Sequence, residues 1–169
     1  MSGNVNCQSA TDKMNVVIKV LDEYEDKCGL PSLTNPCQQE ELNQYLQMNR
    51  TQIEKLSSED CVQIAYRLDQ TAFYIQRLYN REQARILWAQ NELNSILATQ
   101  IDSYNKYWKH EMKVAMIVKQ DPYAAKLHKI VNYATQRTQR LTNMAFLLSN
   151  LSNTMKANQR SKYVGQRTT

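Results

Sequence analysis

The fold is decided by residues 122–157, which read PYAAKLHKIVNYATQRTQRLTNMAFLLSNLSNTMKA. Within this stretch, apolar or small side chains recur at alternating steps of four and three over 29 residues. Such heptad spacing predicts one long helix with a seam for helix–helix packing. We expect this seam to serve self-association, so that the chain forms a homo-oligomer. The seam consists of Leu127, Val131, Ala134, Thr138, Leu141, Ala145, Leu148, Ser152 and Met155.

The remainder of the chain is also predicted to be helical, because helix breakers are scarce. Only three Gly and three Pro occur among 169 residues, where average usage would supply about twenty. Neither occurs between Pro36 and Pro122. This excludes many-stranded barrels, sandwiches and doubly wound sheets, whose turns need both residues. We therefore predict an all-α protein, a long antiparallel helical hairpin or coiled-coil bundle with shorter N-terminal helices.

Two helices are expected in the N-terminal third. The first spans about residues 12–27, and Gly29 follows it as a left-handed C-terminal cap. A strand through residues 16–20 is the alternative that β-branching favours, but the acidic run that follows fits a helix better. The second helix is expected over residues 36–55, with Pro36 near its first position. Its predicted buried stripe is Leu42, Tyr45, Leu46, Ile53 and Leu56.

A third helix is expected to begin at Ser57, where Asp60 follows three residues later as in a capping box. No stop signal occurs before Asp121, although its apolar stripe drifts and allows a break near Asn80 or within residues 99–105. Asp121 then serves as the cap of the last helix, with Pro122 as its first residue.

These boundaries predict an acidic helical segment at residues 1–56, a hairpin core at 57–157 and a basic flexible tail at 158–169. The first ten residues are polar and lack the apolar run of a signal peptide. The most apolar run, residues 144–148, is far too short to span a membrane. We therefore expect a cytoplasmic protein, in the host cytoplasm if it is viral, with no membrane partner.

Recognisable catalytic and metal-binding motifs are missing from the sequence. The four cysteines form no C-x-x-C pair, and structural zinc needs closely spaced ligands. His110 and Glu111 are not followed by a histidine at position 114, so the zinc-protease helix motif fails. A di-iron bundle would need Glu-x-x-His pairs, which do not occur. We expect no enzymatic activity, no metal and no cofactor.

Charge is distributed unevenly along the chain. Residues 1–60 carry five basic and ten acidic side chains, whereas residues 61–169 carry sixteen and six, and no acidic residue follows Asp121. An acid-free basic segment is typical of a surface that binds a polyanion, because affinity grows with the number of phosphates neutralised. The alternative is that this basic half packs on the acidic half of the same or a neighbouring subunit.

The predicted nucleic-acid interface combines the acid-free last helix with two further clusters. A stripe of arginines recurs every four residues on one predicted helix. A segment of interleaved aromatic and basic residues suits single strands, whose bases stack on rings while lysines meet phosphates. In that segment Tyr104 and Trp108 extend the apolar stripe, so Tyr107 is the better stacking residue. The predicted residues are Arg77, Arg81, Arg85, Lys106, Tyr107, Lys109, Lys113, Lys126, Lys129, Arg137 and Arg140.

The segment YNKYWK at residues 104–109 and the acid-free last helix give the chain a character that resembles small accessory proteins of tailed bacteriophages. In size and character it is similar to the recombination mediators that load a phage recombinase onto single-stranded DNA. The resemblance covers roughly residues 57–160. It implies a homo-oligomer that binds single-stranded DNA and contacts a recombinase and a single-strand-binding protein.

Two functional hypotheses follow. In the first, a non-enzymatic oligomer binds nucleic acid, with single-stranded DNA favoured, through its basic C-terminal half, as a phage recombination or replication accessory factor would. In the second, the protein is a structural or scaffold component of a viral or other assembly and acts through helix–helix self-association.

Overall fold

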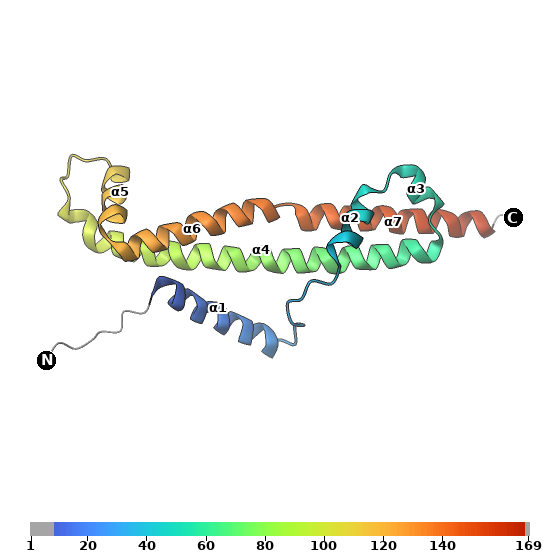
Figure 1. The fold of residues 1–169 in the computed structure, drawn as a ribbon, viewed down its shortest axis with the longest axis horizontal. Coiled ribbons are helices and arrows are strands. Elements are labelled where there is room, and N and C mark those ends of the chain that lie inside the picture. Colours follow the sequence, from blue (N-terminus) through green and yellow to red (C-terminus); the bar gives the residue numbers. More distant parts are fainter. Residues whose placement is uncertain (1–8, 168–169) are drawn as a thin grey trace. The chain divides into compact units, whose positions relative to one another are not determined.

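The computed structural model describes residues 9–167, with side chains to residue 163, and this part of the chain contains helices and no β-strand (Figure 1). The predicted all-α class is therefore confirmed. The elements are α1 (Ala10–Lys27), α2 (Gln39–Gln47), α3 (Arg50–Lys55), α4 (Ser58–Gln100), the 3-10 helix η1 (Ile101–Ser103), α5 (His110–Gln120), α6 (Pro122–Leu141) and α7 (Met144–Arg167).

The chain divides into two compact units, each built from two separate segments of sequence. Of the described residues, unit 1 contains 9–32 and 80–139, and unit 2 contains 33–79 and 140–167. The units therefore do not follow the sequence-ordered segments expected above. The flexible tail expected from residue 158 is also different, because α7 stays helical through Arg167.

The ends of α1 show why this segment is helical. The Asp12 backbone N–H donates to the Ser9 hydroxyl at 3.2 Å, and the Ser9 N–H donates to the Asp12 carboxylate, which completes a capping box. At the other end Gly29 has a φ of 74°, and the Leu30 N–H donates to the Glu25 carbonyl at 3.1 Å. These bonds close the helix as a Schellman motif. The predicted helix and its glycine cap are confirmed, and the strand alternative is wrong.

The second predicted helix begins later than expected. Pro36 does not open it, because the Asn35 side chain accepts the Cys37 backbone N–H at 3.2 Å and holds a turn there. Gln38 is the N-cap of α2, and its side chain makes no capping hydrogen bond. The acidic residues of the first turn instead favour the positive end of this helix dipole.

The same predicted helix is also interrupted at Met48. Asn49 accepts the Gln52 backbone N–H, while the Gln52 side chain accepts the Asn49 N–H at 2.8 Å, so a capping box starts α3 as a new helix. The break turns Met48 toward the core of unit 2 and leaves Leu46 51% exposed. Leu46 was wrongly assigned to the buried stripe, whereas the other four stripe residues pack against the core.

α4 begins where the sequence predicted. The Asp60 backbone N–H donates to the Ser57 hydroxyl at 3.0 Å, and the Asp60 carboxylate accepts the Ser57 N–H. The helix continues through Asn80 and ends at Gln100, inside the second of the two predicted break regions. Beyond it, η1 and a loop lead to α5, and the Tyr104 hydroxyl donates to the Gln120 side-chain oxygen at 2.5 Å, fixing the loop to α5.

The last predicted helix is two helices. Asp121 caps α6 as expected, since its carboxylate accepts the Tyr123 N–H at 2.8 Å and the Ala124 N–H at 3.2 Å, with Pro122 as the first helical residue. The helix then stops at Leu141. Asn143 adopts a φ of 64°, which breaks the helical path before α7 begins. Asparagine tolerates this left-handed conformation better than most residues.

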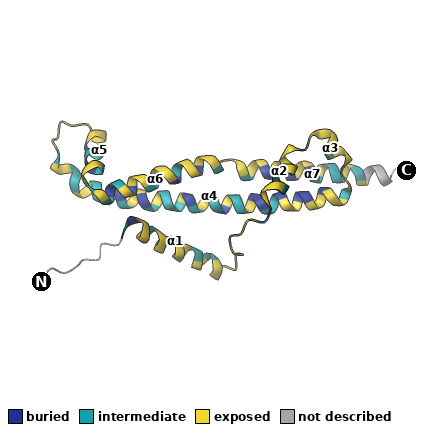
Figure 2. Ribbon diagram, viewed as in Figure 1, coloured by how far each residue is buried: buried dark blue, intermediate teal, exposed yellow. Residues whose placement is uncertain are grey.

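Each unit has its own hydrophobic core, and the dark buried positions follow the inner faces of the helices (Figure 2). In unit 1, Ala89 and Leu93 of α4 pack with Ile117 of α5 and Leu127 of α6. Ala10 of α1 belongs to the same core. The core of unit 2 consists of Ile64, Ala65, Leu68, Ala72, Leu148 and Met155.

Polar contacts reinforce the packing of unit 2. The Ser152 hydroxyl, fully buried, donates to the Ala65 carbonyl at 3.1 Å. Lys156 forms an ion pair with Asp69 at 2.7 Å. Nearer the end of α7, Lys162 donates to the Glu54 carbonyl at 2.8 Å. These bonds attach α7 to α4 and to the end of α3, which explains why residues 158–167 of the expected tail are helical.

Candidate nucleic-acid interface

The heptad seam is buried inside the chain, which corrects its assignment to self-association. Leu127, Ala134, Thr138, Leu148, Ser152 and Met155 are buried, and Val131, Leu141 and Ala145 are half-buried. Leu127 and Val131 pack in the core of unit 1, and Leu148, Met155 and Ala145 pack in that of unit 2. The physical reason is that heptad spacing specifies a helical partner without specifying whether that partner belongs to the same chain.

The predicted arginine stripe is not displayed to solvent. Arg77, in unit 2, is only 9% exposed, and its guanidinium carbon lies 5.8 Å from the centre of the Phe73 ring. In unit 1, Arg81 forms an ion pair with Asp22 of α1. Arg85 forms one with Glu82 in the preceding turn. The prediction identified the helical spacing of the arginines but did not anticipate the carboxylates that neutralise Arg81 and Arg85.

Glu82 is the centre of a charge network, here called the Glu82 network, made of Glu82, Arg85 and Arg137. The residue is 7% exposed, and its Oε1 accepts from Arg85. Its Oε2 accepts from the Arg137 Nε at 2.8 Å, across 55 residues of sequence. One carboxylate thus faces two guanidinium groups, and Arg137, although half of its side chain is exposed, is partly neutralised.

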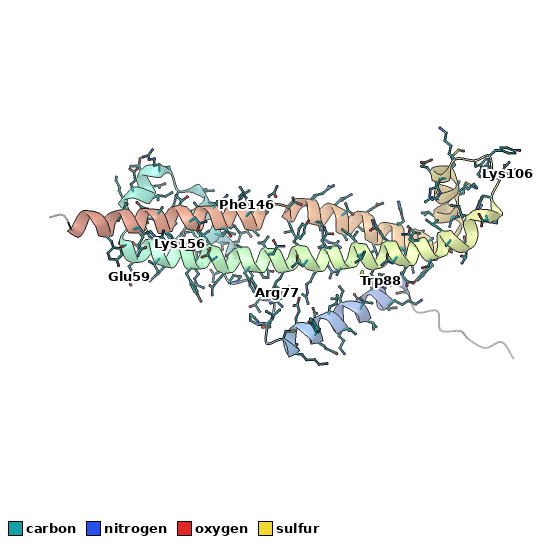
Figure 3. All side chains as sticks on the ribbon, turned by 180° about the vertical axis from the view of Figure 1, so that it is seen from behind. Glu59, Arg77, Trp88, Lys106, Phe146 and Lys156 are labelled. Carbon is teal, nitrogen blue, oxygen red and sulfur yellow. The ribbon has the colours of Figure 1, made fainter. Side chains whose placement is uncertain are left out.

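The loop before α5 forms a cationic aromatic tip. Tyr107 is 83% exposed, and the ammonium group of Lys106 lies 5.5 Å from the centre of its ring. Figure 3 labels Lys106 in this loop. Lys109 is exposed and Lys113 is half-buried. Tyr104 packs against the core of unit 1 and lies 6.2 Å from the Trp108 ring. The tip therefore presents Tyr107 as an exposed ring among lysines.

The outer surface of α6 forms a second cationic region in unit 1. Lys126, Lys129, Tyr133 and Arg137 are all exposed, and at 3.6 residues per turn they fall within an arc of roughly 80°. Leu127, Val131 and Ala134 occupy the opposite side of the helix and face the core. We call these four residues the α6 basic face. Arg140 is also exposed but belongs to unit 2.

An apolar groove also lies in unit 1, between α4, α5 and α6, with a volume of about 650 Å³. Leu93, Leu97 and Val118 contribute to its lining, and His110 and His128 lie at it as well. Among the described residues, no group of three or more His, Cys, Asp or Glu side chains is arranged to hold a metal ion.

A polar cluster at the start of α2 has shifted pKa values. Burial and the neighbouring Glu41 raise the pKa of the Cys37 thiol to about 11. Burial and a hydrogen bond to Glu41 raise the pKa of Tyr45 to about 12, whereas the Tyr45 and Cys37 donors lower the pKa of Glu41. A thiol with a raised pKa stays protonated at neutral pH and is a poor nucleophile. Arg67 of α4 lies 3.8 Å from Glu41, so the cluster attaches α2 to α4.

Other global features agree with this description. Cys28, Cys37 and Cys61 are free thiols, whereas Cys7 lies outside the described residues. Within the described part of the chain, no helix combines the length and apolar character needed to cross a membrane.

In comparisons with known proteins, no protein-family model, curated protein or solved structure matches this sequence or fold.

Proposed function

We propose that the protein is a non-enzymatic, oligomeric helical protein that binds nucleic acid, with single-stranded DNA favoured. In this proposal the ligand lies on unit 1, at the cationic aromatic tip and on the α6 basic face. The long helices form an antiparallel hairpin that presents both regions. The arginine stripe is left out of the interface, because Arg81 and Arg85 already have carboxylate partners and Arg77 is buried.

The observation that carries the proposal is the exposure of lysines without matching acids. Lys126 and Lys129 are exposed on α6, which contains no acidic residue. At the tip, Lys106 and Lys109 are exposed around Tyr107. These lysines have no carboxylate within ion-pair distance among the described residues. Lysines displayed in this way can each neutralise a phosphate, and an exposed tyrosine ring can stack on a base.

The resemblance to recombination mediators supplies a biological setting for the proposal. A protein of that kind acts in the host cytoplasm, loads a phage recombinase onto single-stranded DNA and contacts a single-strand-binding protein. Those two protein partners are part of the proposal.

A salt titration tests the proposal. Lys106, Lys109, Lys113, Lys126 and Lys129 together provide five cations outside the Glu82 network. With a slope of about −0.7 per phosphate contact for a single strand, log affinity should fall with log salt at about −3.5. Raising salt from 50 to 200 mM should then weaken binding roughly 100-fold. Fluorescence anisotropy of a labelled single-stranded oligonucleotide provides the measurement, and a lack of binding at 50 mM salt would refute the proposal.

A matched pair of variants locates the interface. Lys126→Gln with Lys129→Gln removes two charges from the α6 basic face, and Lys19→Gln with Arg50→Gln removes two from exposed positions elsewhere. Glutamine retains helix propensity close to that of lysine, so both pairs should fold. The first pair should reduce the slope to about −2, and the second should leave it unchanged. An equal effect from both pairs would remove the α6 basic face from the proposal.

The alternative, a structural or scaffold role through self-association, is favoured by an apolar face on α4 in unit 2. Val62, Tyr66 and Phe73 are 50%, 61% and 49% exposed and lie on one side of the helix. Because the heptad seam is buried within the chain, self-association requires another surface such as this one. If two copies of α4 pair antiparallel about a two-fold axis, placing Val62 opposite Phe73 also places Tyr66 opposite Asp69.

This pairing has a direct test. Sedimentation should show an oligomer for the unmodified protein and a monomer for Tyr66→Glu, because a buried carboxylate without a partner opposes association. In a background with Cys7→Ser and Cys28→Ser, the variant with both Val62→Cys and Phe73→Cys should form intermolecular disulfides, whereas either substitution alone should not. A monomeric unmodified protein would exclude the structural alternative.

A further inference from the structure

Tyr133 differs in its surroundings from Tyr104 and Tyr123, two other tyrosines of unit 1. Its side chain is 58% exposed, on the side of α6 that faces away from the core. By contrast, the Tyr104 hydroxyl donates to Gln120, and the Tyr123 hydroxyl donates to Glu92 at 3.3 Å. Among the described residues the Tyr133 hydroxyl has no hydrogen-bond partner. Neither packing nor hydrogen bonding within the chain therefore accounts for a tyrosine here.

The neighbours of Tyr133 on the helix are cations. Lys129 lies one turn before it and Arg137 one turn after it, which corresponds to about 6 Å of rise on either side. Lys126 lies a further turn along the same face. Whereas Lys106 lies over the Tyr107 ring at 5.5 Å, no cation of the described chain lies over the Tyr133 ring. That ring face is open to a ligand.

We propose that Tyr133 is a base-stacking residue that makes the α6 basic face selective for single-stranded nucleic acid. The inference rests on the proposed function and adds a residue that sequence reasoning did not single out. Flanking cations hold successive phosphates while an unstacked base lies on the ring, as in other single-strand grooves. In a duplex the bases stack on one another inside the helix, so the ring reaches only the backbone and adds little affinity.

The test compares Tyr133→Ala with Tyr133→Phe on single- and double-stranded oligonucleotides of one sequence. Tyr133→Ala should weaken single-strand binding roughly 10-fold or more and change duplex binding less than 2-fold. Tyr133→Phe should bind like the unmodified protein, because stacking uses the ring and not the hydroxyl. Alanine has a higher helix propensity than tyrosine, so the exposed substitution should not unfold α6. Circular dichroism of each variant checks this directly.

Two further measurements make the outcome decisive. Tyr24→Ala is the matched control, because Tyr24 is 66% exposed on α1 among acidic residues and should contribute nothing to binding. A strand with 5-iodouracil should photocross-link to the α6 peptide that contains Tyr133. If the protein binds single strands while Tyr133→Ala retains full affinity, the stacking role is refuted and the proposed function stands. If the protein binds neither single strands nor duplex, both are refuted.

Discussion

Replacing Glu82 with glutamine should change stability and nucleic-acid binding in opposite directions. Glu82 is 7% exposed and accepts hydrogen bonds from both Arg85 and Arg137. Glu82→Gln preserves the shape of the side chain but removes the negative charge, and its amide oxygen can still accept one hydrogen bond. The amide NH2 group of the glutamine, which can only donate, then faces one of the two guanidinium groups, which can also only donate. One of the two hydrogen bonds is therefore lost.

The loss of stability can be estimated from the exposure of the partners. Breaking a fully buried ion pair costs about 3–5 kcal/mol, but half of the Arg137 side chain and about a quarter of the Arg85 side chain are exposed. Solvent screening reduces the value, so we expect a loss of about 2 kcal/mol. For a chain of this length that corresponds to a decrease of about 4–8 °C in the thermal midpoint. Thermal and urea unfolding followed by circular dichroism measure it.

Binding should become stronger because two guanidinium groups lose their internal counter-charge. At most two additional phosphate contacts become available, so the salt slope for a single strand should steepen by up to about 1.4. Glu23→Gln is the matched control: it changes net charge equally, but its carboxylate makes only an exposed contact with Lys19 at 4.0 Å. If Glu82→Gln lowers stability but leaves the slope equal to that of the control, the idea that Glu82 neutralises the two arginines for binding is refuted.

Three predictions concern the fold. Burial raises the pKa of Asp121, but hydrogen bonds from the Ala124 and Tyr123 N–H groups and from the Gln100 amide outweigh this effect. The net pKa of Asp121 lies below its usual range. The stabilising contribution of Asp121 is therefore present above the unfolded pKa of about 3.9 and lost as pH falls through the folded value. Asp121→Ala should cost about 1 kcal/mol at pH 7 and flatten the acid limb of a pH–stability curve. Asp121→Asn should largely avoid the loss of stability at pH 7, because asparagine also caps a helix. Gly29→Ala should cost about 1–2 kcal/mol in urea unfolding. The φ of 74° is the sole source of this cost, since an added Cβ would meet nothing within 4 Å. An unchanged midpoint would contradict this prediction. Leu68→Ala, at a fully buried position, should cost about 2–5 kcal/mol, whereas Leu46→Ala, at 51% exposure, should cost less than about 1 kcal/mol.

Local signals in the sequence predicted those helix ends that depend on a single side chain. Ser57 with Asp60, Asp121 with Pro122, and Gly29 each act within one turn, and the structure places all of them as predicted. The ends at Met48 and Asn143 were missed. Asparagine tolerates both helix interiors and left-handed turns, so its propensity alone does not distinguish the two.

The candidate interface could be predicted only in part for a related reason. The chemistry of an exposed lysine or tyrosine follows from its residue type alone. Lys126, Lys129 and Tyr107 are exposed, as the proposal needs. The arginine stripe looked equivalent, but its neutralising partner Asp22 lies 59 residues before Arg81. Sequence periodicity reports which residues share a helix face and contains no information on which distant carboxylate faces them.

By itself, the amino-acid sequence determined the helical class, the caps at Gly29, Ser57 and Asp121, and the uneven charge, because propensity, periodicity and capping act over a few residues. Tertiary packing decided what each helix face contacts. It buried the heptad seam from Leu127 to Met155 within the chain, neutralised Arg81 and Arg85, and left the Tyr133 ring exposed among cations. These outcomes depend on contacts between residues far apart in sequence, where burial and ion pairing outweigh local preference.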